Sequence, residues 1–188
     1  MAKSYGITDI GNVRKNNEDN YFLDDYNNVY VVADGMGGHA GGEEASKIVV
    51  FTFQELVEKN KNIFSSEKDS KRVSDLKNFL CECFSLSNRR IYEETLHDTS
   101  LMGMGTTCTA CAINGREAVF SHIGDSRAYI FSNGEIAQVT EDHSYVYEQV
   151  KKGVLTKKQA ETHFLKNVIT RSLGVGENIE IDVIVKKN

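Results

Sequence analysis

The hydrophobic pattern of residues 29–56 predicts a buried strand, a loop and a helix. Residues 29–33 form a short apolar run, which is typical of a buried strand. The run ends at Asp34, and residues 35–42 are rich in glycine. A helix is expected next, because apolar side chains recur at helical spacing at Ala45, Ile48, Val49, Thr52 and Leu56. Asp34 should therefore lie at the rim of a sheet, before a loop whose glycines let a ligand approach the backbone.

The rest of the first half alternates strands, loops and a second helix. Residues 3–10 and 20–33 are predicted as strands, with a hairpin turn at Asn27-Asn28. Residues 60–71 are polar and predicted as a loop. The stripe of the second helix consists of Val73, Leu76, Leu80, Cys83, Phe84, Ser87 and Ile91. That stripe predicts a helix facing the core.

From Gly105 onwards the apolar period changes to two, which indicates antiparallel hairpins. Residues 106–113 and 117–123 flank an Asn-Gly turn, and residues 127–131 and 135–139 flank another, so we expect a meander.

Residues 145–152 are predicted to be helical up to Gly153, and a capping box of Thr156 and Gln159 predicts a helix over 157–164. Residues 179–185 form a last strand. This order favours an α+β fold of two antiparallel sheets packed face to face, with helices outside.

Composition and charge place the chain among ordinary globular proteins. With 188 residues it is long enough for one domain, and 40% hydrophobic and 26% charged residues indicate neither disorder nor a membrane protein. The net charge of −5 argues against a nucleic-acid-binding face. We expect a cytoplasmic protein, because no apolar run could span a bilayer and no signal peptide opens the sequence.

The four cysteines suggest two chemistries that the pattern disfavours. Cys81 with Cys83 and Cys108 with Cys111 could be zinc ligands, but the first pair falls in the second helix and the second in a strand, without the knuckle turns of zinc sites. Cys83 and Arg89 match the spacing of cysteine-dependent phosphatases, yet the residues between them continue a helix instead of a phosphate loop. Reduced, buried thiols are the interpretation we favour.

The glycine loop after Asp34 fits either a phosphate or a hard cation. A nucleotide site is disfavoured, because no Gly-Lys-Ser/Thr ends the loop and Glu43 and Glu44 would repel phosphate. A simple glycine turn is the plain alternative. Two further acidic positions favour the cation, although each also fits an ordinary polar loop or turn: Glu18 and Asp19 follow Arg14, and Asp125 follows a buried strand.

Taken together, several motifs resemble one family, the metal-dependent serine/threonine protein phosphatases (PPM, or protein phosphatase type 2C) in their bacterial form. They occur in the order of the family across nearly the whole chain. They are Arg14 with Asn17-Glu18-Asp19, residues 32–46, Met104 to Thr107, His122 to Arg127, Thr140 to Ser144, and Ile169 to Gly174.

The resemblance implies a four-layer αββα sandwich that hydrolyses phosphoserine and phosphothreonine in phosphoproteins, opposing a bacterial serine/threonine kinase in signalling. It implies two or three Mn²⁺ or Mg²⁺ ions. Asp34 would bridge two metals and the Gly35 carbonyl would bind one, with Asp19 or Glu18 assisting through water and Asp125 helping to bind a third.

The resemblance also implies substrate contacts. Arg14 would hold the substrate phosphate. His39 would contact substrate or donate a proton to the leaving group. Residues 144–168 would form a flap near the substrate.

The sequence departs from the family after residue 185, where relatives continue with Ser-Asp-Gly and Asp-Asn motifs whose aspartates bind metal. We therefore expect residues 1–188 to form a single, C-terminally incomplete domain that binds metal weakly and turns over slowly or not at all. An open sheet edge would invite self-association. The alternative is a catalytically inactive module of the same fold that binds phosphorylated partners.

Overall fold

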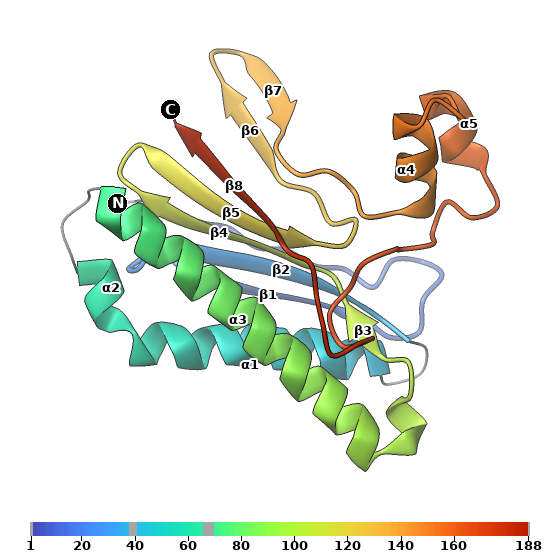
Figure 1. Cartoon of the computed structure of the whole chain (residues 1–188), viewed down its shortest axis with the longest axis horizontal. Helices are drawn as coiled ribbons and strands as arrows, with labels where there is room; N and C mark the ends of the chain where they lie inside the picture. Colours follow the sequence, from blue (N-terminus) through green and yellow to red (C-terminus); the bar gives the residue numbers. More distant parts are fainter. Residues whose placement is uncertain (1, 38–40, 66–69, 188) are drawn as a thin grey trace.

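The computed structural model describes residues 2–37, 41–65 and 70–187 of the chain. The strands are β1 (Asp19–Asp24), β2 (Val29–Met36), β3 (Gly105–Thr106), β4 (Cys108–Asn114), β5 (Glu117–Ile123), β6 (Tyr129–Ser132), β7 (Glu135–Gln138) and β8 (Asp182–Lys187). The helices are α1 (Gly41–Lys59), α2 (Lys61–Ser65), α3 (Ser70–His97), α4 (Tyr145–Lys151) and α5 (Lys157–Thr162), with a 3₁₀ turn η1 (Thr99–Leu101). Figure 1 shows the helices α1 and α3 crossing the sheet, while α4 and α5 stand apart from it.

The main sheet is antiparallel and has the strand order β1-β2-β4-β5-β8, with β3 beside β2. Its hairpin turns follow from asparagine and glycine: Asn28 has a φ of 57° and Gly115 a φ of 65°. These values suit the tight turns that fit the twist of adjacent strands. The strands β6 and β7 form a separate two-stranded sheet that projects beyond the main one (Figure 1).

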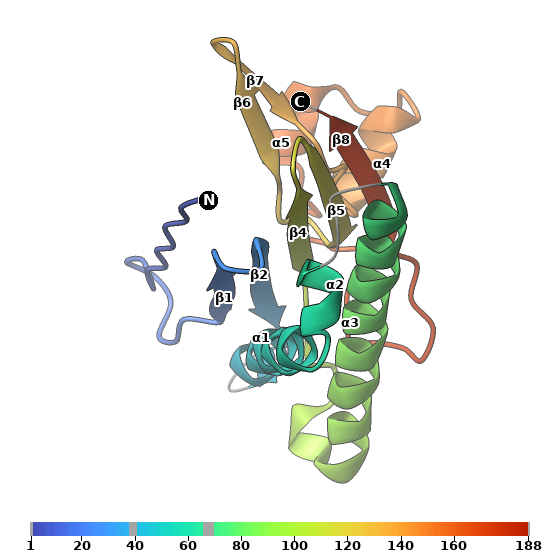
Figure 2. The same ribbon diagram turned by 90° about the vertical axis from the view of Figure 1, so that its left-hand side faces the viewer.

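One face of the main sheet packs against α1 and α3, and the core lies between them (Figure 2). Val29, Val31 and Ala33 alternate into this layer and are at most 2% exposed. Phe53 of α1 meets Phe84 of α3 edge to face, with ring centroids 6.0 Å apart. Burial of each such side chain stabilises the fold by about 1.5–3 kcal/mol. The two predicted helical stripes are confirmed.

The opposite face of the main sheet, which we call the second face, is only partly covered. Its residues are those that alternate away from the helices, including Asp19, Tyr21, Val32 and Asp34. Tyr21 is 38% and Val32 is 45% exposed. On β2, the side chains of Val32 and Asp34 are therefore exposed on this face.

Three local predictions were wrong. Residues 3–10 are irregular, with Tyr5 and Ile7 exposed, because no neighbouring strand pairs with them in the described structure. The predicted loop over 60–71 contains α2, which buries Phe64. The two C-terminal hairpins do not form one meander, because β5 pairs with β8 and the chain leaves the main sheet at Gly124, whose φ is +111°.

The α+β class with antiparallel sheets and flanking helices is confirmed. Within the described residues the second sheet consists of the β6–β7 ribbon. None of the helices in the described ranges combines the length and apolar character needed to cross a bilayer.

The cysteines are free thiols on α3 and β4, as expected. Burial raises the pKa of Cys83 and Cys108, so neither is poised as a nucleophile or metal ligand.

Candidate metal centre

Asp34 and Asp19 face each other across the β1–β2 pair. The register places them directly opposite, and both side chains lie on the second face of the sheet. Two carboxylates in this arrangement repel each other, and like charges opposite on a sheet destabilise it. A sheet keeps such a pair only at a cost, which suggests a ligand that offsets the charge.

Asp125 joins this pair from the corner between β5 and β6. It follows Gly124, where a side chain is excluded because a Cβ atom would meet Thr107 Cβ at 2.6 Å. Partial burial raises the pKa of Asp125, and the nearby Asp142 raises it further. The corner therefore holds the Asp125 carboxyl group close against the body of the protein.

The pKa of Asp34 is affected by both other acids. Partial burial raises it to about 6, and the charges of Asp19 and Asp125 add to the effect, as does a hydrogen bond between Asp34 and Asp19 in which the protonated Asp34 is the donor. Arg14 lowers the same pKa. The structure thus brings together Asp19, Asp34 and Asp125, which lie far apart in the sequence, with Arg14 as the opposing charge near Asp34.

Buried hydroxyl groups form the floor under these acids. The Asp34 amide donates to Thr107 Oγ1 at 3.0 Å, while the Asp34 carbonyl accepts from Thr107 N at 2.9 Å and from Thr106 Oγ1 at 3.0 Å. Thr107 Oγ1 lies 2.7 Å from Ser126 Oγ, and Thr109 Oγ1 is 3.1 Å from the Ser126 carbonyl. The backbone of Asp34 and the corner after Asp125 are therefore joined through one strand.

Sequence reasoning missed the roles of these threonines. Thr106 and Thr107 belong to one of the family motifs, and all three threonines, with Thr109, belong to a predicted strand, but the sequence alone assigns them no function. The signal available was a set of hydroxyl residues in a strand that is otherwise apolar, since buried hydroxyls need partners.

Gly35 fits the site because two backbones meet there. A Cβ atom at Gly35 would lie 2.0 Å from the Gly42 carbonyl oxygen, so the end of β2 touches the first turn of α1 directly. The Glu18 carbonyl accepts from Gly35 N at 3.1 Å and from Ser46 Oγ at 2.6 Å. Three segments are thereby fastened around Asp34, and the role of the Gly35 carbonyl as a ligand stays a prediction.

The Glu18 side chain reaches the start of α1, and its role as a ligand through water stays a prediction. Its carboxylate lies near Gly42 at the start of α1, where the helix dipole favours negative charge. Arg14 is 77% exposed, with Nη1 3.8 Å from Glu18 Oε2. Arg14 is thus free to reorient toward a ligand. His39 lies outside the described residues.

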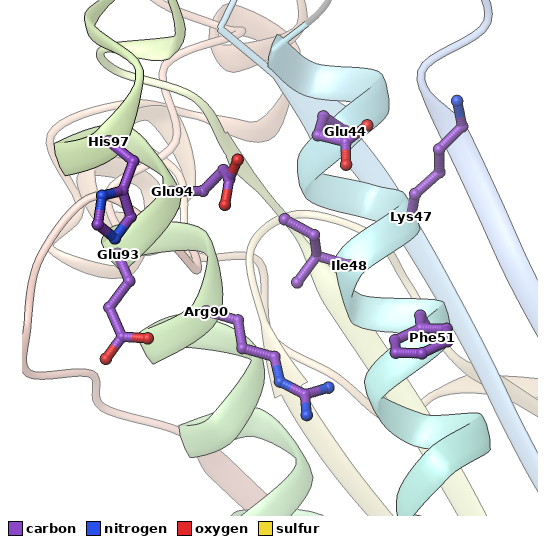
Figure 3. Close-up of a pocket in the computed structure, with 8 residues that line it drawn as sticks. All are labelled: Glu44, Lys47, Ile48, Phe51, Arg90, Glu93, Glu94 and His97. Atoms are coloured by element: carbon purple, nitrogen blue, oxygen red, sulfur yellow. The ribbon is translucent and has the colours of Figure 1, made fainter.

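Two hollows adjoin the acids. A cavity of about 190 Å³ is lined by Asp19, Asp34, Ser126 and residues 7–8. A larger one, of about 540 Å³, lies between the Asp125 corner and helices α4 and α5. A third groove, of about 460 Å³, opens between α1 and α3 (Figure 3). It belongs to the helices that cover the other face, and its Arg90 is occupied with Glu55 and Thr52.

The donor chemistry fits a hard divalent cation. Such ions prefer carboxylate oxygens. Arg14 lies near Asp34, and Arg127 near Asp125 is paired with a further carboxylate, Asp142, so the acids leave an excess of negative charge. Across residues 2–37, 41–65 and 70–187, no set of three or more His, Cys, Asp or Glu side chains is arranged to hold an ion unaided. The role of the three aspartates as metal ligands therefore stays a prediction.

The chain is similar in sequence to known proteins. Residues 12–179 match the family model for protein phosphatase 2C. A serine/threonine phosphatase stp from Listeria monocytogenes is 33% identical over 181 residues, which are 95% of this chain and 69% of that protein.

Solved structures give the same picture. The chain superimposes on serine/threonine phosphatase Stp1 from Staphylococcus aureus with a TM-score of 0.84 and 32% identity, over 96% of this chain and 69% of that one. It also matches the catalytic domain of the serine/threonine protein phosphatase PstP in complex with two manganese ions. There the TM-score is 0.78 and the identity 32%, over 94% of this chain and 68% of that one.

Proposed function

Because the chain belongs to the protein phosphatase 2C family, we propose that it hydrolyses phosphoserine and phosphothreonine esters in proteins with the help of divalent cations. The observation that carries the proposal is the convergence of Asp19 and Asp125 on Asp34. Family membership indicates the class of reaction, and the three aspartates mark the proposed position of the active site.

The residues of the chain have distinct tasks in this proposal. Asp34, fixed by Thr106 and Thr107, would be the central metal ligand, with Asp19 and Asp125 at its sides and the Gly35 carbonyl next to it. When bound, the cations would activate a water molecule for attack on phosphorus and offset the charge of the phosphoryl oxygens.

Arg14 and His39 are the proposed substrate contacts. The exposed guanidinium of Arg14 can swing from Glu18 to the phosphate and bind it through two parallel hydrogen bonds. His39 is proposed to contact the substrate or protonate the leaving group.

The metals are proposed to be Mn²⁺ or Mg²⁺, in a set of two or three. Oxygen donors suit both ions, and the PstP structure carries two manganese ions. The partial ligand set supports weak binding by residues 1–188 alone, and hence slow turnover.

The larger cavity suggests where the protein substrate lies. It runs from Asp125 to residues of α4 and α5, within the proposed flap of residues 144–168. The proposed substrates are cytoplasmic proteins that a bacterial serine/threonine kinase has phosphorylated. Neither nucleic acid nor membrane is proposed as a partner. Residues 1–188 would act as one phosphatase domain.

The test is manganese-dependent hydrolysis of a phosphothreonine peptide and of p-nitrophenyl phosphate. We expect slow release of phosphate that needs Mn²⁺ and is lost in Asp34→Asn. Arg14→Ala should raise KM for the peptide more than it lowers kcat. The control is Glu135→Gln, which also replaces a carboxylate by an amide but lies on the exposed strand β7. It should leave the rate unchanged.

If the wild-type chain binds the phosphopeptide with Mn²⁺ present and releases no phosphate above the Asp34→Asn background, the proposal of catalysis by this chain is refuted.

A further inference from the structure

His143 lies directly behind the corner that carries Asp125, and the roles described so far do not use it. Its side chain is 7% exposed. It comes from the segment between β7 and α4, outside the main sheet. A buried histidine beside a proposed metal ligand needs partners for both ring nitrogens.

His143 forms hydrogen bonds with both backbone polar groups of Gly124, one through its ring and one through its own backbone amide. The Gly124 amide donates to His143 Nδ1 at 3.1 Å, and the His143 amide donates to the Gly124 carbonyl at 2.7 Å. Because Nδ1 accepts a hydrogen bond, it carries no proton, so the neutral ring has its proton on Nε2. The contact thus selects one tautomer.

Asp182 and Arg171 complete the arrangement on the far side of the ring. Nε2 of His143 lies 3.2 Å from Asp182 Oδ2, and this oxygen accepts a hydrogen bond from the protonated Nε2. Arg171 Nη1 donates to the other oxygen, Asp182 Oδ1, at 3.3 Å. A carboxylate that accepts from the ring fixes both its orientation and its tautomer, as in the supports of many functional histidines.

A second buried histidine, His122, contacts both His143 and a threonine hydroxyl beneath the acids. The ring centroids of His122 and His143 are 4.9 Å apart. His122 Nε2 donates to the Glu141 carbonyl at 3.1 Å, and Nδ1 lies 2.9 Å from Thr109 Oγ1. His143 is therefore wedged between the sheet and the corner.

The corner needs such support because of Gly124. Its φ of +111° is open only to glycine, and glycine has the largest backbone freedom to lose. Asp125 follows immediately, so any rotation at Gly124 moves its carboxylate. Metal ligands must be held within a few tenths of an ångström to bind well.

We propose that His143, oriented by Asp182, is the positioning residue for Asp125: it fixes the Gly124 peptide and so places the Asp125 carboxylate for a divalent cation. The assignment of a cation to Asp125 rests on the proposed function. The hold of His143 on Gly124 does not.

The first experiment reads the hold without metal. In ¹⁵N-labelled protein, NMR should show His143 with the proton on Nε2, and the Gly124 amide should exchange slowly with solvent. His143→Ala should accelerate that exchange at least tenfold relative to the amides of β5. His143→Asn, whose amide oxygen can accept where Nδ1 did, should restore much of the protection. An Nδ1-protonated ring, or unchanged Gly124 exchange in His143→Ala, overturns the proposal.

The second experiment measures Mn²⁺ affinity in a double-mutant cycle. His143→Ala should weaken binding about tenfold, as loss of a ligand's support usually does, and Asp182→Ala should weaken it less. His143→Asn should recover most of the affinity. In an Asp125→Ala background, His143→Ala should have no further effect, because its action passes through Asp125.

His163→Ala is the matched control. His163 also accepts a backbone amide through Nδ1, from Leu165 N at 3.1 Å, but does so in the flap. It should leave Mn²⁺ affinity unchanged. Additive losses in His143→Ala/Asp125→Ala would show general destabilisation and contradict the proposal. If wild-type protein binds no Mn²⁺, the proposed function fails, and the Gly124 exchange rates decide the role of His143.

Discussion

Asp34 combines a cost to the metal-free fold with its proposed role as the central ligand. Partial burial, and then the neighbouring charges of Asp19 and Asp125, raise the pKa of this carboxyl group to about 6. An acidic residue at this position, beside two other carboxylates, does not stabilise the fold. The acid is therefore better explained by what it binds than by what it contributes to folding.

This raised pKa gives the metal-free protein a defined pH dependence. The group titrates at about 6 when folded against 3.8 as a model value, so the folded state holds the proton more tightly. Stability should fall as pH rises from about 4 to about 6. Asp34→Asn should remove that fall and stabilise the protein at pH 7 by about 0.5–1 kcal/mol, limited by solvent screening. Urea unfolding in EDTA at several pH values measures it, with Glu135→Gln as control.

A second prediction at this scale concerns Gly35. Because a Cβ atom would approach the Gly42 carbonyl oxygen to 2.0 Å, Gly35→Ala should destabilise the protein by about 2–3 kcal/mol. The nearest atom to a Cβ at Gly176 is 3.9 Å away, so Gly176→Ala should change stability by less than about 0.5 kcal/mol. Equal effects of the two substitutions in urea unfolding would disprove the close contact between β2 and α1.

At the scale of elements, the sequence predicted what is encoded locally. The hairpin turns at Asn28 and Asn133 and the two helical stripes are as expected, because turn residues and apolar periodicity act within a few residues. Residues 3–10 show the limit: they alternate like a strand, but a strand needs a neighbour. The departure of β6 from the sheet depends on Gly124 packing against Thr107, which no local pattern shows.

The capping box of α5 allows a test of the flap. Thr156 Oγ1 accepts from Gln159 N at 3.3 Å, and the Gln159 side chain accepts from Thr156 N at 2.8 Å. Thr156→Ala should destabilise α5 locally by about 1 kcal/mol. Hydrogen exchange should accelerate in residues 157–162 and stay unchanged in β4. Spread of the effect to the main sheet would mean that α5 is not a separate unit.

At the scale of the whole molecule, the arrangement leaves apolar side chains in solvent. Phe131 and Ile136 face each other across the β6–β7 ribbon and are 73% and 69% exposed. Such pairs favour association, and the ribbon also has open edges.

We predict concentration-dependent self-association of this chain. In Phe131→Ser/Ile136→Thr it should weaken at least fivefold, as measured by sedimentation. The exposed pair Lys157 and Lys158, changed to Ser and Thr, is the control. A wild-type chain that stays monomeric up to about 0.5 mM would contradict this prediction.

The candidate acids could be chosen from the sequence, whereas the residues that support them could not, and the role of the acids as ligands stays a prediction. Asp19 opens β1, Asp34 lies near the end of β2 and Asp125 follows β5. Thr107 and His143 could not be chosen, because their partners lie 73 and 19 residues away and are set by the tertiary structure.

The most direct test of the account is a calorimetric titration of Mn²⁺ into the wild-type chain and into Asp34→Asn at pH 7.5, where Asp34 is ionised. The account predicts weak but saturable binding to the wild type and to Glu135→Gln, and at least tenfold weaker binding to Asp34→Asn, although that variant is the more stable protein. Equal affinity in all three would contradict it.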